Sequence, residues 1–158
     1  MPRERVRIRN VVDIRRPIDE VFQYVTTPGN WPRWHPSSLA VRGVVARSGR
    51  EGDDVIEDYR VAGRRGRVTC TVVDSEPPVR WAIRGSAEQR WRGTVRYTLA
   101  PVAHPGGAAT RFERELAYTP PSGWWAVLDS LLLRRRVRAE SAEALRRLKV
   151  ALEASTTG

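Results

Sequence analysis

The chain is poor in the residues that build disulfide bonds and metal sites. Its 158 residues include one cysteine, Cys70, and two histidines, His35 and His104. A single thiol excludes an intramolecular disulfide, and these three side chains fall short of the ligand set of an ordinary zinc site. We therefore expect no metal or other cofactor, and a reducing compartment.

Long apolar runs are also missing. No segment approaches the roughly 20 apolar residues of a membrane-spanning helix, and the basic N-terminal stretch MPRERVRIRN precedes no apolar run of the kind found in a secretory signal. We therefore expect a soluble cytoplasmic protein.

Lysine is almost absent, although the chain is strongly basic. All of the 28 basic residues except Lys149 are arginines, and the formal net charge is +10. Such a charge suits nucleic acid or an anionic membrane surface. The arginines are scattered through strand-like segments and do not alternate with exposed aromatic residues on one element, so the sequence does not favour nucleic acid. Peripheral contact of a basic helix with a membrane stays open, as does the oligomeric state.

The remaining composition is that of one folded domain covering residues 1–158, with 41% hydrophobic residues and six tryptophans. Residues 5–14 alternate between apolar and charged side chains, which predicts a half-buried strand. Pro17 then fits the start of a short helix whose apolar residues recur at i, i+3, i+4 and i+7. After it we expect a second, very short helix at 31–34, capped by Asn30.

The middle of the chain has the period of antiparallel strands. Apolar residues alternate between turns rich in glycine and proline, which predicts six more strands. Their expected ranges are 39–47, 54–61, 66–75, 79–85, 93–102 and 110–118.

The last segment, residues 124–154, contains no glycine or proline and predicts one long helix. Its expected apolar stripe comprises Leu128, Leu131, Leu132, Ala139, Ala142, Leu145, Leu148 and Leu152. The order of elements predicts an α+β fold, in which a curved seven-stranded antiparallel sheet grips the long C-terminal helix and two short helices follow the first strand.

Several segments together resemble the START-like helix-grip superfamily of polyketide cyclases/dehydrases and lipid-transport proteins. They are residues 16–22 (RPIDEVF), 31–36, 74–78 with Trp81, 107–112 and 131–152. The resemblance covers nearly the whole chain and implies a cavity between the sheet and the last helix that takes a hydrophobic or aromatic small molecule. It does not imply one activity, because the superfamily includes both enzymes and carriers.

Small residues in the helix stripe point to the same cavity. Ala139 and Ala142 would leave space opposite a concave sheet, and either a ligand or the large side chains of Tyr59, Trp81 and Tyr97 would fill it. Both alternatives stay open from the sequence.

Two charged residues occupy strand positions that alternation assigns to the interior. Glu57 and Arg114 each lie on an otherwise apolar face, and a lone buried charge is costly. They would pair with each other or with a ligand, for which Arg114 would anchor a carboxylate, enolate or phenolate. Glu57 would act as a base if desolvation raises its pKa. A water-filled or ion-paired pocket lining without chemistry is the alternative, and an error of one residue in the strand register would turn both side chains outward.

The candidate site combines these residues with the aromatic corner before the sheet. Trp31 is expected to pack, whereas Trp34 and His35 are candidates for the cavity entrance. The candidate ligand-binding residues are Trp34, His35, Glu57, Tyr59, Cys70, Trp81, Tyr97, Phe112, Arg114, Leu128, Ala139 and Ala142. The candidate acid and base residues are Glu57, Tyr97 and His35.

Three functions remain open from the sequence. The first is a binding protein for a lipid-like or polyketide-like molecule. The second is a cyclase or dehydratase in which Glu57 enolises the substrate and Tyr97 or His35 supplies a proton. The third is an interaction protein that uses the basic helix around Arg134, Arg135 and Arg136.

Overall fold

The computed structural model describes residues 5–87, 91–119 and 124–154, with the backbone alone for residue 91 and residues 124–130. The strands are β1 (Val6–Ile14), β2 (Ser38–Gly43), β3 (Asp54–Val61), β4 (Arg64–Glu76), β5 (Arg80–Ala87), β6 (Trp91–Val102) and β7 (Ala109–Tyr118). The helices are α1 (Ile18–Thr26), the one-turn 3₁₀ helix η1 (Pro28–Asn30), α2 (Trp31–Trp34) and α3 (Trp124–Ala154).

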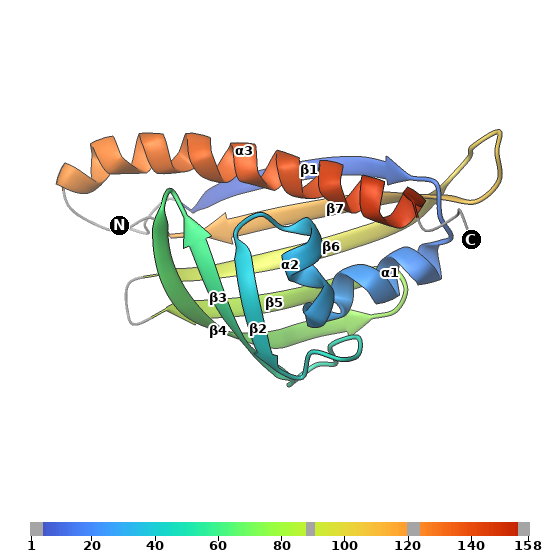
Figure 1. The fold of residues 1–158 in the computed structure, drawn as a ribbon, viewed down its shortest axis with the longest axis horizontal. Helices are drawn as coiled ribbons and strands as arrows, with labels where there is room; N and C mark the ends of the chain where they lie inside the picture. The colour runs from blue at the N-terminus through green and yellow to red at the C-terminus, as the bar shows by residue number, and fades with distance from the viewer. Residues whose placement is uncertain (1–4, 88–90, 120–123, 155–158) are drawn as a thin grey trace.

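The strands form one antiparallel sheet in the order β1-β7-β6-β5-β4-β3-β2. The sheet curves strongly, and α3 lies across its concave side (Figure 1). This arrangement confirms the α+β fold with a long C-terminal helix predicted from the sequence.

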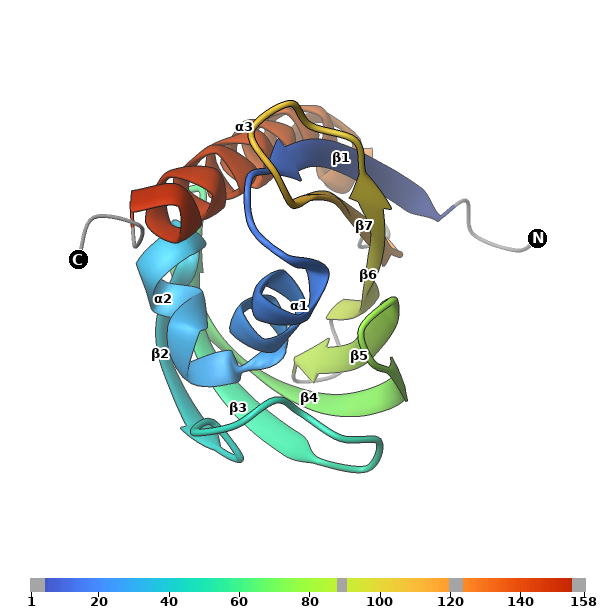
Figure 2. The ribbon, with the colours of Figure 1, turned by 90° about the vertical axis from the view of Figure 1, so that its right-hand side faces the viewer.

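Helix α1 lies inside the curve of the sheet at one end of the molecule (Figure 2). It buries Val21, Phe22 and Val25, as the spacing of apolar residues predicts. The predicted cap by Asn30 is wrong, because its side chain makes no capping bond to α2 and Nδ2 instead donates to the carbonyl of Tyr24 at 3.1 Å. Asn30 therefore fixes the corner between α1 and α2.

Strand β2 is shorter than predicted, ending at Gly43. Gly43 has a φ of +99°, and a Cβ there would lie 2.7 Å from the carbonyl oxygen of Asp54, so the backbone turns away at a position that only glycine fits easily. The loop that follows returns to the α1 end. In it the amide of Gly49 donates to the carbonyl of Thr26, and its own carbonyl accepts from Trp81 Nε1, both at 2.9 Å.

The turn between β3 and β4 is tighter than predicted. It consists of Ala62 and Gly63, both with positive φ, which is the requirement of a two-residue type I′ hairpin. Strand β4 therefore begins at Arg64, and the hairpin extends toward α3 (Figure 1).

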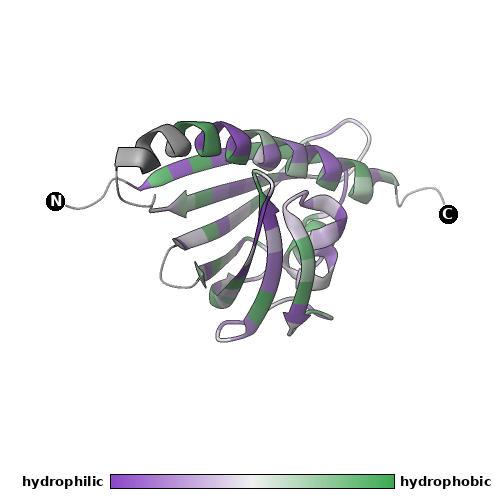
Figure 3. Ribbon diagram, turned by 60° about the vertical axis from the view of Figure 1, so that its left-hand side comes forward, coloured by the Kyte–Doolittle hydropathy of each residue, from purple (hydrophilic) through white to green (hydrophobic). Residues whose placement is uncertain are grey.

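The two halves of α3 differ from each other, and half of the predicted stripe is wrong. Leu145, Leu148 and Leu152 are buried as predicted, but the upstream members of the stripe with described side chains are exposed. These exposed residues are Leu131, Leu132, Ala139 and Ala142. Neighbouring apolar residues left the phase of the helix ambiguous, and the inward row runs through Val137 and Ser141 instead. In Figure 3 the hydrophobic and hydrophilic bands of α3 follow one another along the helix without forming a single apolar stripe.

Candidate ligand-binding site

A cavity of about 530 Å³ lies between α3 and the concave face of the sheet. This volume falls within the usual range for small-molecule sites. Among the described residues, the exposed lining residues all lie at the β3–β4 turn or on the first half of α3, which places the mouth there. They are Ala62, Arg64, Arg65, Leu132 and Arg136.

Tyr97 on β6 lines the cavity and is the centre of an aromatic cluster. Its ring stacks on Trp81 with centroids 5.2 Å apart, meets Phe112 edge-on at 5.1 Å, and lies 6.4 Å from Trp34. Trp81 and Phe112 are completely buried and do not reach the cavity, so they hold Tyr97 in place. Burial raises the pKa of Tyr97 to about 12. The hydroxyl is therefore protonated at neutral pH and can donate a hydrogen bond or a proton.

Arg114 on β7 pairs directly with Tyr97 in the strand register and is only 6% exposed. Its Nη1 donates to Ser141 Oγ at 3.3 Å, and its Nε has no acceptor. No carboxylate among the described residues lies within ion-pairing distance of this guanidinium. The cavity wall therefore carries a buried positive charge that no contact with the described residues neutralises.

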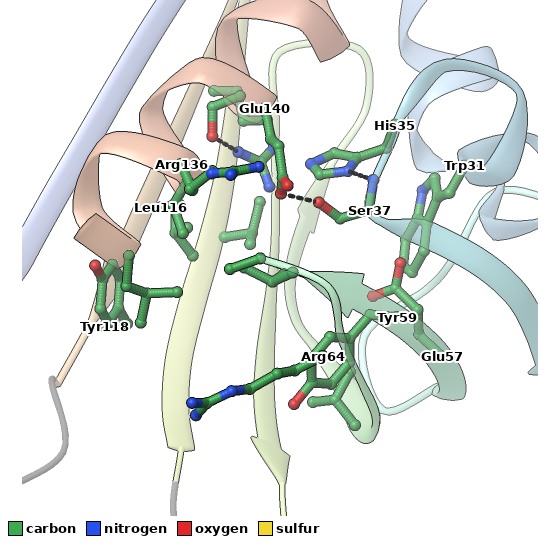
Figure 4. A pocket seen from close by; sticks show the side chains of 18 of the residues that line it. Trp31, His35, Ser37, Glu57, Tyr59, Arg64, Leu116, Tyr118, Arg136 and Glu140 are labelled. Carbon is green, nitrogen blue, oxygen red and sulfur yellow. Dashed lines mark hydrogen bonds between the residues drawn. The ribbon is translucent and has the colours of Figure 1, made fainter. Parts of the chain in front are cut away.

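Glu57 on β3 also points into the cavity (Figure 4). Burial has the largest effect on its carboxyl and raises its pKa, while the Ser38 hydroxyl and the charge of Arg114 act in the opposite direction. No direct ion pair joins Glu57 and Arg114 in the part of the chain that the structure describes. The sequence left open whether these two charges pair with each other or with a ligand, and the pair with each other is not formed.

His35 lies at the same wall, immediately after α2. Its Nδ1 accepts a hydrogen bond from the amide of Ser37 at 3.2 Å, and Nε2 is buried without a partner. Burial, and then the charges of Arg114 and Arg147, hold the pKa of His35 well below its usual value of 6.5. His35 is therefore a neutral imidazole whose ring is fixed by the backbone after α2.

A hydrogen bond between Ser37 and Glu140 ties α3 to the corner before β2 (Figure 4). Ser37 Oγ donates to Glu140 Oε2, and Glu140 lies one residue before the Ser141 that holds Arg114. This contact places two polar residues of α3 over the cavity.

With this geometry in view, comparison with known proteins decides the family. The profile of the family described as "Polyketide cyclase / dehydrase and lipid transport" matches residues 5–153. The chain belongs to this family. No curated protein sequence matches the chain.

Solved structures of similar fold come from proteins of low sequence identity. The Zhui aromatase/cyclase from Streptomyces sp. R1128 superimposes with a TM-score of 0.80 at 14% identity, over 98% of each chain. The protein TTHA0849 from Thermus thermophilus gives 0.78 at 15% identity, over 96% of this chain and all of the other. A START superfamily protein from Mycobacterium smegmatis gives 0.73 at 12% identity, over 95% of this chain and 99% of the other. These likenesses show the fold, which is the helix-grip fold of the START and polyketide cyclase type.

In this member of the polyketide cyclase/dehydrase and lipid-transport family, the predicted site residues divide into those that line the cavity, those in the core and those on α3. The residues that line the cavity are Trp34, His35, Glu57, Tyr59, Tyr97 and Arg114. Those buried in the core beside it are Cys70, Trp81 and Phe112. Burial, with Glu57 adding to it, raises the pKa of Cys70 to about 12, which argues against a reactive thiolate there.

The predicted contributions of α3 are corrected. Ala139 and Ala142 face away from the cavity, because the helix is rotated relative to the predicted stripe. Leu128 lies in the turns of α3 whose side chains fall outside the described residues. Trp31, predicted only to pack, is buried with its Nε1 donating to the carbonyl of Val25 at 3.0 Å, and it also lines the cavity.

The polar lining residues on α3 and on the β3–β4 hairpin were missed from the sequence. They are Arg64, Arg65, Arg136, Glu140 and Ser141, together with Ser37 in the corner before β2. One signal was available, because Ser141 lies four residues before Leu145 and seven before Leu148 and so continues their row toward the start of α3. A polar residue at such a position indicates partners in the interior.

Among the described residues, no helix combines the length and the hydrophobicity that spanning a bilayer would require. No group of three or more His, Cys, Asp or Glu side chains in residues 5–87, 91–119 and 124–154 is arranged to hold a metal ion.

Proposed function

We propose that the protein binds a hydrophobic or aromatic small molecule in the cavity and that Arg114 orients the polar end of this ligand. The observation that carries the proposal is the buried guanidinium of Arg114, which lines the cavity without a carboxylate at contact distance among the described residues. A ligand with a negative or strongly polar group would supply the missing partner.

The rest of the lining suits an apolar or aromatic body. Trp31, Trp34 and Tyr97 present aromatic surface, and buried aliphatic side chains from the sheet, such as Val68 and Ile83, complete it. Aromatic and aliphatic lining with a few fixed polar groups is typical of small-molecule sites.

A matched pair of fluorescent probes tests the proposal. Anilinonaphthalene sulfonate carries a negative charge, whereas N-phenylnaphthylamine has a similar aromatic body without it. We expect both to bind, and Arg114→Met to weaken binding of the sulfonate by at least about tenfold while changing that of the neutral probe by less than about twofold. Arg84→Met, which removes an exposed arginine from β5, is the control. Equal affinity of Arg114→Met and the original protein for the sulfonate would count against the proposal.

A second candidate function, a cyclase or dehydratase, is favoured by one specific observation. Glu57, whose pKa burial raises, and Tyr97, which stays protonated, line the same cavity as Arg114. In this proposal Glu57 takes a proton from the carbon between two carbonyl groups, and Arg114 stabilises the resulting enolate. The enolate carbon attacks another carbonyl of the same substrate, and Tyr97 protonates the alkoxide that forms. Glu57 then releases its proton to solvent and Tyr97 regains one, which restores both groups.

Exchange of deuterium into benzoylacetone, followed by NMR, separates this enzyme from a carrier. An enzyme would accelerate exchange at the carbon between the carbonyls, and Glu57→Gln would abolish the acceleration without weakening binding. A carrier would bind the diketone with no acceleration in either protein.

A further inference from the structure

The mouth of the cavity is built from two segments that are far apart in the sequence. In the part of the chain that the structure describes, the β3–β4 hairpin turn and the first half of α3 supply all of its exposed lining residues. Figure 1 shows the turn lying close to this half of α3. We call residues 59–67 and 131–139 together the rim.

All of the charged residues in the rim are positive. It contains eight arginines and no aspartate or glutamate. Arg67 is paired with Asp58 just outside the rim. Arg135 and Arg138 are exposed, and neither forms an ion pair with a carboxylate that the structure describes. A large part of the net charge of the chain is thus concentrated around one opening.

Exposed leucines lie among these arginines. Leu131 is 56% exposed and Leu132 is 66% exposed. Leu131, Arg135 and Arg138 fall at i, i+4 and i+7 of α3, so they share one face of the helix. This face is apolar at its start and cationic along its length, and it does not pack against the sheet.

We propose that the rim docks on a membrane surface that contains anionic lipids. In the docked state Leu131 and Leu132 enter the boundary between headgroups and acyl chains, and the arginines bind lipid phosphates. The exposed leucines favour a lipid surface over nucleic acid or an acidic protein, because charge alone would satisfy the arginines but would leave the leucines in water. Docking would place the cavity mouth against the lipid, so that an apolar ligand enters without crossing water.

Vesicle flotation tests this docking without needing a ligand in the cavity. The full chain is mixed with vesicles of phosphatidylcholine alone, and with vesicles containing about 30% phosphatidylglycerol, at low salt and at 0.5 M NaCl, where the Debye length falls to about 4 Å. We expect binding to the anionic vesicles at low salt and little binding to the neutral ones. Circular dichroism establishes that each variant is folded.

The variants avoid the residues that line the cavity. Arg135→Gln/Arg138→Gln is expected to weaken partitioning roughly 30-fold, and Leu131→Ser about fivefold. Arg84→Gln/Arg92→Gln removes the same charge from exposed positions on β5 and β6, and its partitioning should change by less than about threefold.

Three outcomes would overturn the proposal. The first is absence of binding to anionic vesicles at low salt. The second is an equal loss in the β5/β6 control, which would show general attraction of a basic protein. The third is a Leu131→Ser variant that binds like the original, which would point to a purely charged partner such as an acidic protein or a nucleic acid. Because no ligand is involved, these results are independent of the probe titrations that test ligand binding.

Discussion

The two halves of α3 cover different parts of the interior, a packed core at one end and a cavity at the other. From Ala144 to Leu152 the helix buries Ala144, Leu145, Leu148 and Leu152 against the core that also contains α1. From residue 131 to residue 141 it covers the cavity, and there Glu140 and Ser141 point inward while Leu131 and Leu132 face solvent.

This difference shows where the usual rule for amphipathic helices applies. Where the helix packs on other side chains, the apolar residues face inward, because burying them stabilises the fold. Where it covers the cavity, Glu140 and Ser141 face inward alongside the apolar Val137. Leu131 and Leu132 face solvent there, and neither the inward polar groups nor the outward leucines favour stability. Departures from local rules concentrate at functional sites. The two ends of α3 should therefore differ in energetics as they do in composition.

The same substitution at the two ends should have unequal effects on the free energy of unfolding. Leu148 is completely buried in the packed half, whereas Leu133 is half-buried at the cavity. Leu148→Ala should lower the free energy of unfolding by about 2–5 kcal/mol, because it leaves a void in a packed core. Leu133→Ala should lower it by about 1 kcal/mol. Urea unfolding followed by circular dichroism measures both, and equal losses would remove the energetic difference between the two halves.

His35 should make stability fall in acid. Burial, and then the charges of Arg114 and Arg147, lower the pKa of His35 in the folded state below 6.5. At lower pH the unfolded chain therefore binds a proton on this imidazole more readily than the folded protein does. The free energy of unfolding should therefore decrease as pH falls from about 6.5, by about 1.4 kcal/mol for each unit by which the pKa is lowered. Asn in place of His35 keeps an acceptor for the Ser37 amide and cannot titrate, so His35→Asn should flatten this slope in urea unfolding between about pH 5 and 8. A slope that survives in the variant would assign the acid sensitivity to other groups.

The pKa shift of Glu57 should change the free energy of unfolding with pH in the opposite direction. Its folded pKa is raised above 4.5 chiefly by burial, so the folded state binds the proton more tightly than the unfolded chain. Its contribution to the free energy of unfolding is thus lost as pH rises from about 4.5 through the raised value. Glu57→Gln should be more stable than the original at neutral pH, by about 1.4 kcal/mol per unit of raised pKa, and the gain should vanish below about pH 4.5. A variant that is less stable at neutral pH would show that the carboxylate is held by a favourable partner.

The fold and the aromatic and charged strand residues could be predicted from the sequence, but the half of the site on α3 could not. Glu57 and Arg114 each have apolar residues two positions before and two positions after them in their strands, so both were assigned to the interior correctly. In α3 the pattern cannot be phased, because Leu131 to Leu133 follow one another and apolar residues there face solvent. A helix phase inferred from hydrophobicity fails where the helix covers a cavity, so Glu140 and Ser141 were missed.

Arg114 should contribute little to stability even though it is buried. Its guanidinium has lost water without gaining a carboxylate at contact distance among the described residues, so a methionine of similar length should serve the fold as well. We expect the free energy of unfolding of Arg114→Met to lie within about 1 kcal/mol of the original value or above it. A loss of more than about 2 kcal/mol would make Arg114 a structural residue and would weaken its proposed role toward a ligand.

The smallest expected effect on stability is at Gly66, which leaves room for Tyr59 beside the cavity. A Cβ at Gly66 would clash with the hydroxyl oxygen of Tyr59, so in Gly66→Ala the ring must move, and the open side is the cavity. We expect stability to change by less than about 1 kcal/mol, because the alanine also favours the strand, while N-phenylnaphthylamine binds several-fold more weakly. The double variant Tyr59→Leu/Gly66→Ala should restore probe binding, since the shorter side chain clears the new methyl group. If Gly66→Ala binds the probe like the original, the ligand does not occupy the space beside Tyr59, and the mouth side of the cavity contributes little to binding.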